Sequence, residues 1–231
     1  MNLFFTDSKD IQPKSLIVRG QEADHITKVL RHSIGDTVFV TDGRGNCYKC
    51  QINDLKKSTV FLDINDTKKE PVKKPQVTLC LGVIKKRDRL EFAVEKAVEL
   101  GVSKFILFKG EHSQKGNVRE DRLESTAIAA MKQSLRFYLP EIIIEESLED
   151  AVSTHSGDCK IIVADETIDD SNQEFNESQE YFLIVGPEGG FSNSERDFLK
   201  TIKADYYSLG EKRLRAETAA IVMVDRFANQ K

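Results

Sequence analysis

The sequence of 231 residues lacks any long apolar run, and its apolar stretches fall short of the 18 or more residues that a membrane-spanning helix needs. Its N-terminus also lacks the basic segment followed by an apolar one that marks a secretory signal. Cysteine is scarce, with four in the chain, and two of these lie in segments that resemble buried strands. We therefore expect a cytoplasmic protein with no membrane partner and no disulfides.

Groups of residues that could hold a metal are missing as well. Cys47 and Cys50 form one Cys-x-x-Cys pair, but a tetrahedral zinc site needs four ligands, and no second pair or His-x-x-x-His follows. Two strand cysteines are therefore favoured over half of a zinc site. His25 and His32 lack carboxylate or cysteine partners at metal-ligand spacing, so structural histidines are favoured over a site. No metal is expected.

The sequence also lacks an excess of positive charge. The net charge of -4 argues against a generic nucleic-acid binder, whose binding surface is usually basic. The total hides an asymmetry, because residues 1–75 hold 13 Lys and Arg against 10 Asp and Glu, whereas the remainder holds 21 against 28. The front part of the chain is the basic one, although a solvated charged face is the usual explanation of such a difference.

What the chain does contain is typical of a folded globular protein, with 39% hydrophobic and 31% charged residues. Residues 66–75 combine two prolines with four lysines and show no apolar periodicity, the pattern of an exposed linker. The sequence therefore predicts a small domain of residues 1–70 and a larger one of residues 75–231. No internal repeat is present.

Short alternating runs broken by turn residues predict a small β-barrel in the first domain. The expected strands cover residues 15–18, 37–41, 48–52 and 59–64, and one helix covers residues 21–31.

In the second domain strands alternate with helices, which predicts an α/β fold with a mainly parallel sheet and helices on both faces. The expected helices cover residues 87–100 and 119–138, with a third over 220–228. The expected strands cover residues 77–83, 102–108, 142–144, 160–164 and 181–185. Residues 166–180 are polar and aperiodic, which predicts a mobile loop.

Ligands of open α/β sheets bind beyond the carboxyl ends of the strands, which directs attention to the loops after Ala164, Val185 and Leu209. The middle loop, residues 186–192, has the sequence Gly-Pro-Glu-Gly-Gly-Phe-Ser, and Ser192 and Glu195 have capping-box spacing. Neither dinucleotide nor P-loop spacing is present, and the carboxylate would repel a phosphate. A ligand-binding turn and a sharp turn without a ligand both remain open on this pattern alone.

The third loop, residues 209–219, places three cations beside a carboxylate at a strand end. Cations next to a glycine-rich turn indicate a site for an anion or for developing negative charge. A solvated helix start is the alternative.

These motifs resemble those of the RsmE family of SPOUT methyltransferases, whose members have GPEGG-F-S after one strand and LG-x-R-x-LR-x-ETA after the next. The resemblance extends to the front, where residues 25–31, 35–36 and 42–45 are similar to the family's PUA-like barrel. It also includes residues 96–102, which look like the family's K-x-x-E-L-G-V helix end. Nearly the whole chain is covered in register.

The resemblance implies a SPOUT α/β domain with a deep trefoil knot behind a PUA-like β-barrel, a homodimer, and S-adenosyl-L-methionine as cofactor. The implied activity is methylation of N3 of a specific uridine in 16S ribosomal RNA of the small subunit. The implied cofactor-binding residues are Ala164, Asp165, Gly186, Pro187, Glu188, Gly189, Gly190, Leu209, Gly210 and Leu214.

Methylation of N3 requires that nitrogen to lose its proton, because its lone pair attacks the methyl group. Arg215 is expected to hold the uracil anion, and Glu217 to accept the proton, to orient Arg215, or only to cap the last helix.

Residues 132–136 depart from the family's pattern and keep only Gln133 and Arg136, which with Arg31 are the expected RNA contacts. Two alternatives remain: a related enzyme that methylates a ribose 2′-hydroxyl or a transfer-RNA base, and a non-catalytic RNA-binding ribosome assembly factor.

Overall fold

A computed structural model describes residues 2–113, 118–166 and 180–229. Contacts along the chain divide it into two compact units. The N-terminal unit comprises Met1–Val72 and Met131–Leu139, and the C-terminal unit comprises Lys73–Ala130 and Pro140–Lys231. Most of the predicted loop at residues 166–180 lies outside the described residues.

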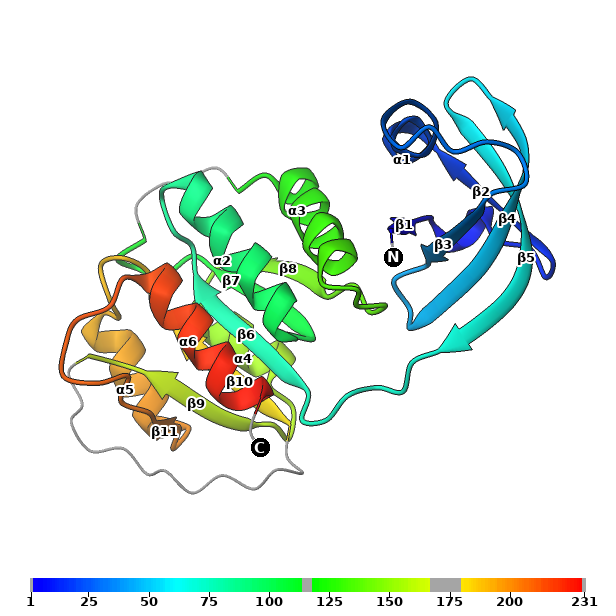
Figure 1. The fold of residues 1–231 in the computed structure, drawn as a ribbon. Coiled ribbons are helices and arrows are strands. Elements are labelled where there is room, and N and C mark those ends of the chain that lie inside the picture. The colour runs from blue at the N-terminus through cyan, green and yellow to red at the C-terminus, as the bar shows by residue number, and fades with distance from the viewer. Residues whose placement is uncertain (1, 114–117, 167–179, 230–231) are drawn as a thin grey trace. The chain divides into compact units, whose positions relative to one another are not determined.

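The N-terminal unit is built on a curved sheet (Figure 1). Within the described ranges the sheet has five strands in the order β1-β3-β4-β5-β2, antiparallel except for the β1–β3 pair. Register shifts between Lys49 and Cys50 and between Ile52 and Asp54 interrupt the long β4–β5 ladder, and such bulges bend a sheet. Its elements are β1 (Leu3–Phe5), η1 (Ser8–Asp10), β2 (Ser15–Arg19), α1 (Gly20–Asp24), η2 (His25–Val29), β3 (Thr37–Thr41), β4 (Asn46–Lys56) and β5 (Thr59–Lys69).

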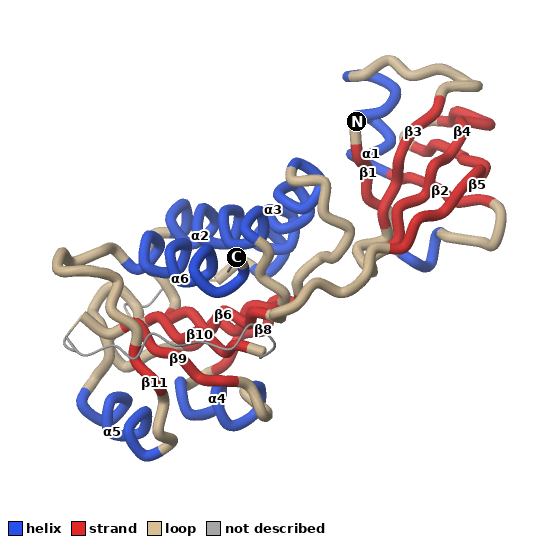
Figure 2. The backbone as a smooth tube through the Cα atoms, turned by 60° about the horizontal axis from the view of Figure 1, so that its bottom comes forward, coloured by secondary structure: helices blue, strands red, loops and turns tan. Residues whose placement is uncertain are grey.

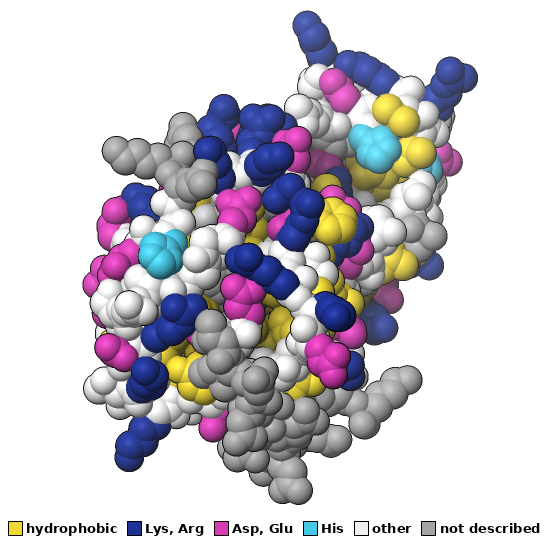
Figure 3. Space-filling view, turned by 90° about the vertical axis from the view of Figure 1, so that its left-hand side faces the viewer, with side chains coloured by type: hydrophobic (Ala, Val, Ile, Leu, Met, Phe, Trp, Pro, Cys, Tyr) yellow, Lys and Arg dark blue, Asp and Glu magenta, His cyan; other side chains and the backbone are white. Residues whose placement is uncertain are grey.

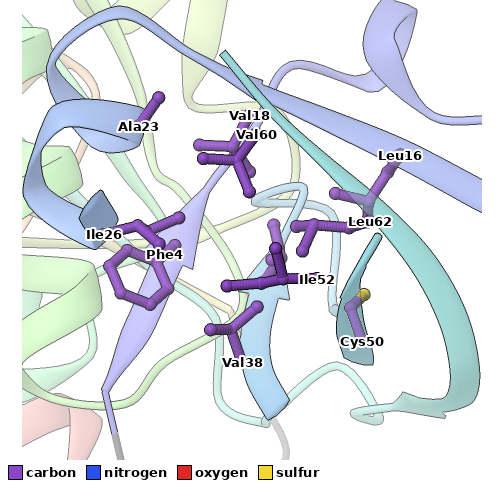
Figure 4. Packing of buried hydrophobic residues seen from close by; sticks show 11 residues of the cluster. Phe4, Leu16, Val18, Ala23, Ile26, Val38, Cys50, Ile52, Val60 and Leu62 are labelled. Atoms are coloured by element: carbon purple, nitrogen blue, oxygen red, sulfur yellow. The ribbon is translucent and has the colours of Figure 1, made fainter. Parts of the chain in front are cut away.

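The concave side of this sheet buries an apolar core, shown in Figure 4. Alternate residues of the strands point into it, and Ala23 and Ile26 close it from α1 and η2. The four predicted strands are confirmed, and β4 and β5 extend beyond the predicted ends. The helix predicted over residues 21–31 is instead a short α-helix that widens into the π-helical turn η2 and ends before Arg31, whose φ is 57°.

The segment Met131–Leu139 belongs to the N-terminal unit, and the helix predicted over residues 119–138 is wrong at its C-terminal end. Helix α3 (Glu120–Gln133) stops five residues earlier, and Leu135 takes a left-handed φ of 55°. Phe137 is then buried against Leu3 and Cys47. Its carbonyl accepts a 2.8 Å hydrogen bond from Gly45 N, and Lys132 pairs with Glu22.

The C-terminal unit is a parallel sheet between two layers of helices (Figure 2). In the described part of the chain its six strands have the order β11-β9-β10-β6-β7-β8. Helices α2 and α6 cover one face, α4 and α5 cover the other, and an apolar cluster lies between the sheet and these last two. The elements are β6 (Val77–Gly82), α2 (Arg87–Leu100), β7 (Lys104–Phe108), β8 (Glu141–Glu145), α4 (Leu148–His155), β9 (Lys160–Ala164), β10 (Tyr181–Val185), α5 (Asn193–Thr201), β11 (Asp205–Tyr206) and α6 (Ala216–Ala228).

The predicted α/β class and mainly parallel sheet are confirmed, as are the bounds of α2. Three details differ from the predictions. Helix α4 was not predicted, β11 ends at Tyr206 rather than Leu209, and α6 begins at Ala216 rather than four residues later. Because Val185 is in register with Ala164 and Leu81, the segments after β9, β10 and β6 leave the sheet at one edge.

Candidate active site

A cavity of about 620 Å³ lies at this edge of the C-terminal unit. Its walls come from the ends of β9 and β10, the segment between β11 and α6, and the first turns of α2 and α6. Two side chains from the turn after β10 and the end of β11, Phe191 and Tyr207, add aromatic surface. The residues predicted from the sequence that line it are Ala164, Asp165, Gly186, Pro187, Glu188, Gly190, Leu209, Gly210, Leu214 and Arg215.

The turn after β10 contributes Gly186, Pro187, Glu188, Gly190 and Phe191 to the wall. Gly190 has a φ of 71°, which L side chains rarely adopt, and its N–H donates a 2.9 Å hydrogen bond to the Pro187 carbonyl. The predicted capping box is confirmed: Glu195 N donates to Ser192 Oγ over 3.1 Å, and Ser192 N donates to Glu195 Oε2 over 2.7 Å. This reciprocal pair fixes the direction in which α5 leaves the turn.

Gly189 belongs to the same turn but does not line the cavity. A β-carbon there would lie 2.8 Å from His112 Cβ, so this glycine allows close packing against the segment after β7. Glu188 is held by the segment after β6, since its Oε2 accepts a 3.0 Å hydrogen bond from Lys85 N.

Two ion pairs fix the segment after β9. Asp165 is buried, and Arg196 Nε of α5 donates a 2.9 Å hydrogen bond to its Oδ2, which raises the pKa of Arg196. Glu166 Oε2 lies 2.9 Å from Arg213 Nε and joins this segment to the one before α6 at the exposed rim.

Arg215 stands at the mouth of the cavity as the N-cap residue of α6. Its carbonyl accepts a 2.8 Å hydrogen bond from Ala219 N, while its exposed side chain forms no ion pair with the residues that the structure describes. The exposed side chain of Lys212 likewise forms no ion pair with the residues that the structure describes. The wall thus presents two cations that have no ion-pair partner among the described residues and can meet an anion.

Glu217 lies behind this wall and does not line the cavity. It is buried, and its Oε1 is 3.5 Å from Arg89 Nε. Its Oε2 has no hydrogen-bond partner within the described part of the chain. Arg89 itself lines the cavity.

The three expected RNA contacts lie in the N-terminal unit. Arg31 and Gln133 are exposed, and Arg136 is half-buried, which lowers the pKa of its guanidinium. On the face that Figure 3 presents, the described Lys and Arg side chains are interspersed with Asp and Glu rather than gathered in one basic patch.

The structure places Cys47 and Cys50 on β4, both buried and with free thiols. No group of three or more His, Cys, Asp or Glu among the described residues is placed to hold a metal ion. Nor is any helix in those ranges long and apolar enough to cross a membrane.

The cavity can hold an elongated ligand with an apolar or aromatic part and a polar part, because backbone groups, aromatic rings and charged side chains share its wall. Arg215 and Lys212, which have no ion-pair partner in the described ranges, can stabilise negative charge that develops beside them. This combination suits group transfer to an anionic acceptor.

Comparison with known proteins identifies the family. Residues 71–228 match the model of an RNA methyltransferase domain, and residues 18–65 match that of an RNA methyltransferase PUA domain. The chain belongs to this RNA methyltransferase family. A Rickettsia conorii relative of the family, ribosomal RNA small subunit methyltransferase E, is 32% identical over 206 residues, which cover 87% of this chain and 83% of the relative. The resemblance of the sequence motifs to the RsmE family is confirmed.

Solved structures agree with this assignment to the RNA methyltransferases. One from Porphyromonas gingivalis, described as a probable rRNA-methyltransferase, has a TM-score of 0.89 and 30% identity, and the match covers 99% of this chain and 98% of the other. Another, ribosomal RNA small subunit methyltransferase E from Neisseria gonorrhoeae bound to S-adenosyl methionine, has a TM-score of 0.86 at 21% identity and covers 99% and 97%. It shows the same fold.

The wall residues of this methyltransferase that sequence reasoning did not assign to the site include Arg89, Phe191 and Tyr207. Phe191 was visible in the glycine-rich turn but was not assigned a role. Arg89 lies in a helix whose pattern predicts only an amphipathic face, so nothing local indicates that it reaches the cavity.

Proposed function

We propose that this chain methylates N3 of a specific uridine in 16S ribosomal RNA of the small subunit, with S-adenosyl-L-methionine as methyl donor. The observation that supports this most strongly is the gathering of the glycine turn, Leu209, Gly210 and the unpaired Arg215 around one cavity in a member of the RNA methyltransferase family. The named relatives modify small-subunit ribosomal RNA, which supports the substrate.

The wall fits the proposed cofactor. Backbone groups of Gly186, Gly190 and Gly210 leave room for close approach, and Leu209 and Leu214 offer apolar surface for the adenosine part. When bound, S-adenosyl-L-methionine supplies an electrophilic methyl group on a sulfonium. Ala164, Asp165, Pro187 and Glu188 complete the proposed cofactor site, and Gly189 contributes by holding the turn against His112.

The chain's own contribution to the chemistry is charge stabilisation. N3 of uridine becomes nucleophilic when its proton passes to hydroxide or water of the solvent, and the negative charge then spreads over the flanking carbonyl oxygens. Arg215 is a cation at the mouth of the cavity without an ion-pair partner among the described residues, so it is available to hold that anion. Glu217 does not line the cavity and acts through Arg89, whose Nε lies 3.5 Å from its Oε1.

The proposal includes a homodimer that works in the cytoplasm, a trefoil knot in which the C-terminal helix α6 is threaded through a loop, and RNA contacts through Arg31, Gln133 and Arg136. The partner subunit would then supply the contacts around Gln133 and Arg136. Sedimentation velocity at micromolar concentration tests this arrangement, and a stable active monomer would contradict it.

Two measurements test the activity. Calorimetric titration with S-adenosyl-L-methionine should show stoichiometric binding; absence of binding would favour a non-catalytic RNA-binding assembly factor. Nucleoside analysis of ribosomal RNA from a strain that lacks this protein should show loss of 3-methyluridine from 16S RNA. Loss of a 2′-O-methylated nucleoside or of a transfer-RNA modification would instead assign one of the related activities.

A further inference from the structure

Arg89, in the first turn of α2, connects two parts of the cavity that are far apart in the sequence. Its Nη1 lies 3.5 Å from Glu188 Oε1 in the turn after β10, and its Nε lies 3.5 Å from Glu217 Oε1 in the first turn of α6. A guanidinium is planar and presents its donors in a fixed fork. Arg89 therefore holds the two carboxylates at a set separation while its side chain also lines the cavity.

At the start of α6, Arg89 pairs with the carboxylate of Glu217, which has few other polar contacts among the described residues. The Glu217 side chain is 9% exposed, and within the described ranges Arg89 is the cation paired with it. A buried carboxylate that loses its cation is strongly disfavoured, so the pair fixes where this side chain lies. Glu217 lies in the first turn of α6, two residues after Arg215, so the pair connects Arg89 to the start of the helix at which Arg215 is the N-cap.

At the other end, Glu188 is engaged through both oxygens. Lys85 N donates to Oε2 over 3.0 Å, and Arg89 lies beside Oε1. The segment from β6 to α2 thus holds the turn that contains Gly186 and Gly190, two of the three glycines that line the cavity.

We propose that Arg89 is a positioning residue for methyl transfer, which acts through Glu188 and Glu217 to keep the glycine turn and Arg215 at a fixed separation across the cavity. This inference rests on the proposed function and deepens it. Glu217 then serves to anchor Arg89 and the start of α6, and it does not accept the proton of the uracil. Neither Arg89 nor Glu217 needs to touch the RNA.

The test compares Arg89→Gln with Arg89→Lys and with the control Arg87→Gln. Arg87 lies two residues earlier on the same helix, is exposed, and pairs only along α2 with Asp88 and Glu91 among the described residues. Each variant is assayed for thermal unfolding, for S-adenosyl-L-methionine affinity by calorimetry, and for the single-turnover rate on small-subunit RNA at saturating cofactor.

Arg89→Gln should weaken cofactor binding about tenfold and lower the single-turnover rate by roughly a hundredfold, the loss expected when reacting groups are misplaced by about 1 Å. Arg89→Lys should recover part of the rate, because an ammonium reaches one carboxylate but does not span both. Arg87→Gln should match the wild type in both measurements. Wild-type affinity and rate in folded Arg89→Gln would overturn the proposal.

A double variant tests whether Arg89 acts through Glu217. Arg89→Gln combined with Glu217→Gln should lose little more rate than either single change, because both remove the same contact. Losses that multiply would overturn the proposal. Glu188→Gln carries the test if Arg89→Gln does not fold: it should also lower the rate, and a wild-type rate would refute the inference. Failure of the wild type to bind the cofactor would refute the proposed function instead, and this result is distinct from all the others.

Discussion

Replacement of Arg215 by alanine separates catalysis from folding in this cavity. The side chain is exposed and forms no ion pair with described residues, and the N-cap of α6 uses only the backbone of this residue. The free energy of unfolding should therefore change by no more than about 0.5 kcal/mol, the usual range for such surface positions. The cofactor affinity should also stay close to that of the wild type, since the sulfonium-bearing ligand is not an anion at its reactive end.

The rate should respond very differently. Loss of one donor that stabilises developing negative charge raises a barrier by roughly 3 to 4 kcal/mol, which corresponds to about a hundredfold to a thousandfold in rate. Single-turnover assays with saturating cofactor measure this step directly. A higher pH should partly restore the variant, because hydroxide in solution deprotonates N3 when no cation stabilises the anion.

Lys212→Ala is the matched control, since this lysine lies in the same segment, lines the same cavity and also has no ion-pair partner among the described residues. It should lower the rate far less, because a lysine does not offer the planar fork that matches the uracil carbonyl edge. A wild-type rate in Arg215→Ala, or an unfolded variant, would show that Arg215 is structural and that the proposed stabilisation is wrong.

Three further predictions concern the rest of the molecule. Gly190→Val should abolish binding of S-adenosyl-L-methionine in calorimetry and lower stability by about 1 to 3 kcal/mol, because a branched side chain is strained at a φ of 71°; unchanged affinity would exclude the turn from the cofactor site. Phe137→Ala should destabilise the N-terminal unit by about 3 kcal/mol in chemical denaturation, since the ring is buried against Leu3, and an unchanged midpoint would contradict that packing. Burial raises the pKa of Cys50 to about 12 and also raises that of Cys47, so both should resist iodoacetamide at pH 8, where little thiolate forms; rapid labelling of the folded protein would refute this.

Local signals predicted much of the fold. The bounds of α2 follow from its apolar periodicity and from Gly101, which ends the helix with a φ of 111°. Helix α4 was missed although Ser147 caps it by accepting a hydrogen bond from Asp150 N, a spacing visible in the sequence. The C-terminal end of α3 is different, because nothing in the helical pattern shows that Phe137 belongs to the N-terminal unit and packs against Leu3 and Cys47.

In the candidate site, too, some features could be predicted from local sequence and others could not. Glycines and cations beyond strand ends were predictable, since parallel strands place their carboxyl ends at one edge. The orientation of single residues was not: Gly189 packs on His112, and Glu217 lies behind the wall rather than in it. Those outcomes depend on contacts between segments about 75 to 130 residues apart, which no local pattern encodes.

The discontinuous N-terminal unit has a consequence for how this protein can be divided. Because Met131–Leu139 returns to that unit, the polypeptide crosses between the two units three times rather than once. A fragment that stops at Val72 would leave the apolar surface of Leu3 and Cys47 uncovered, even though it contains the whole β-sheet of the unit. A single cut or a single recombination event therefore cannot remove or exchange the complete N-terminal unit. The two units must be inherited together.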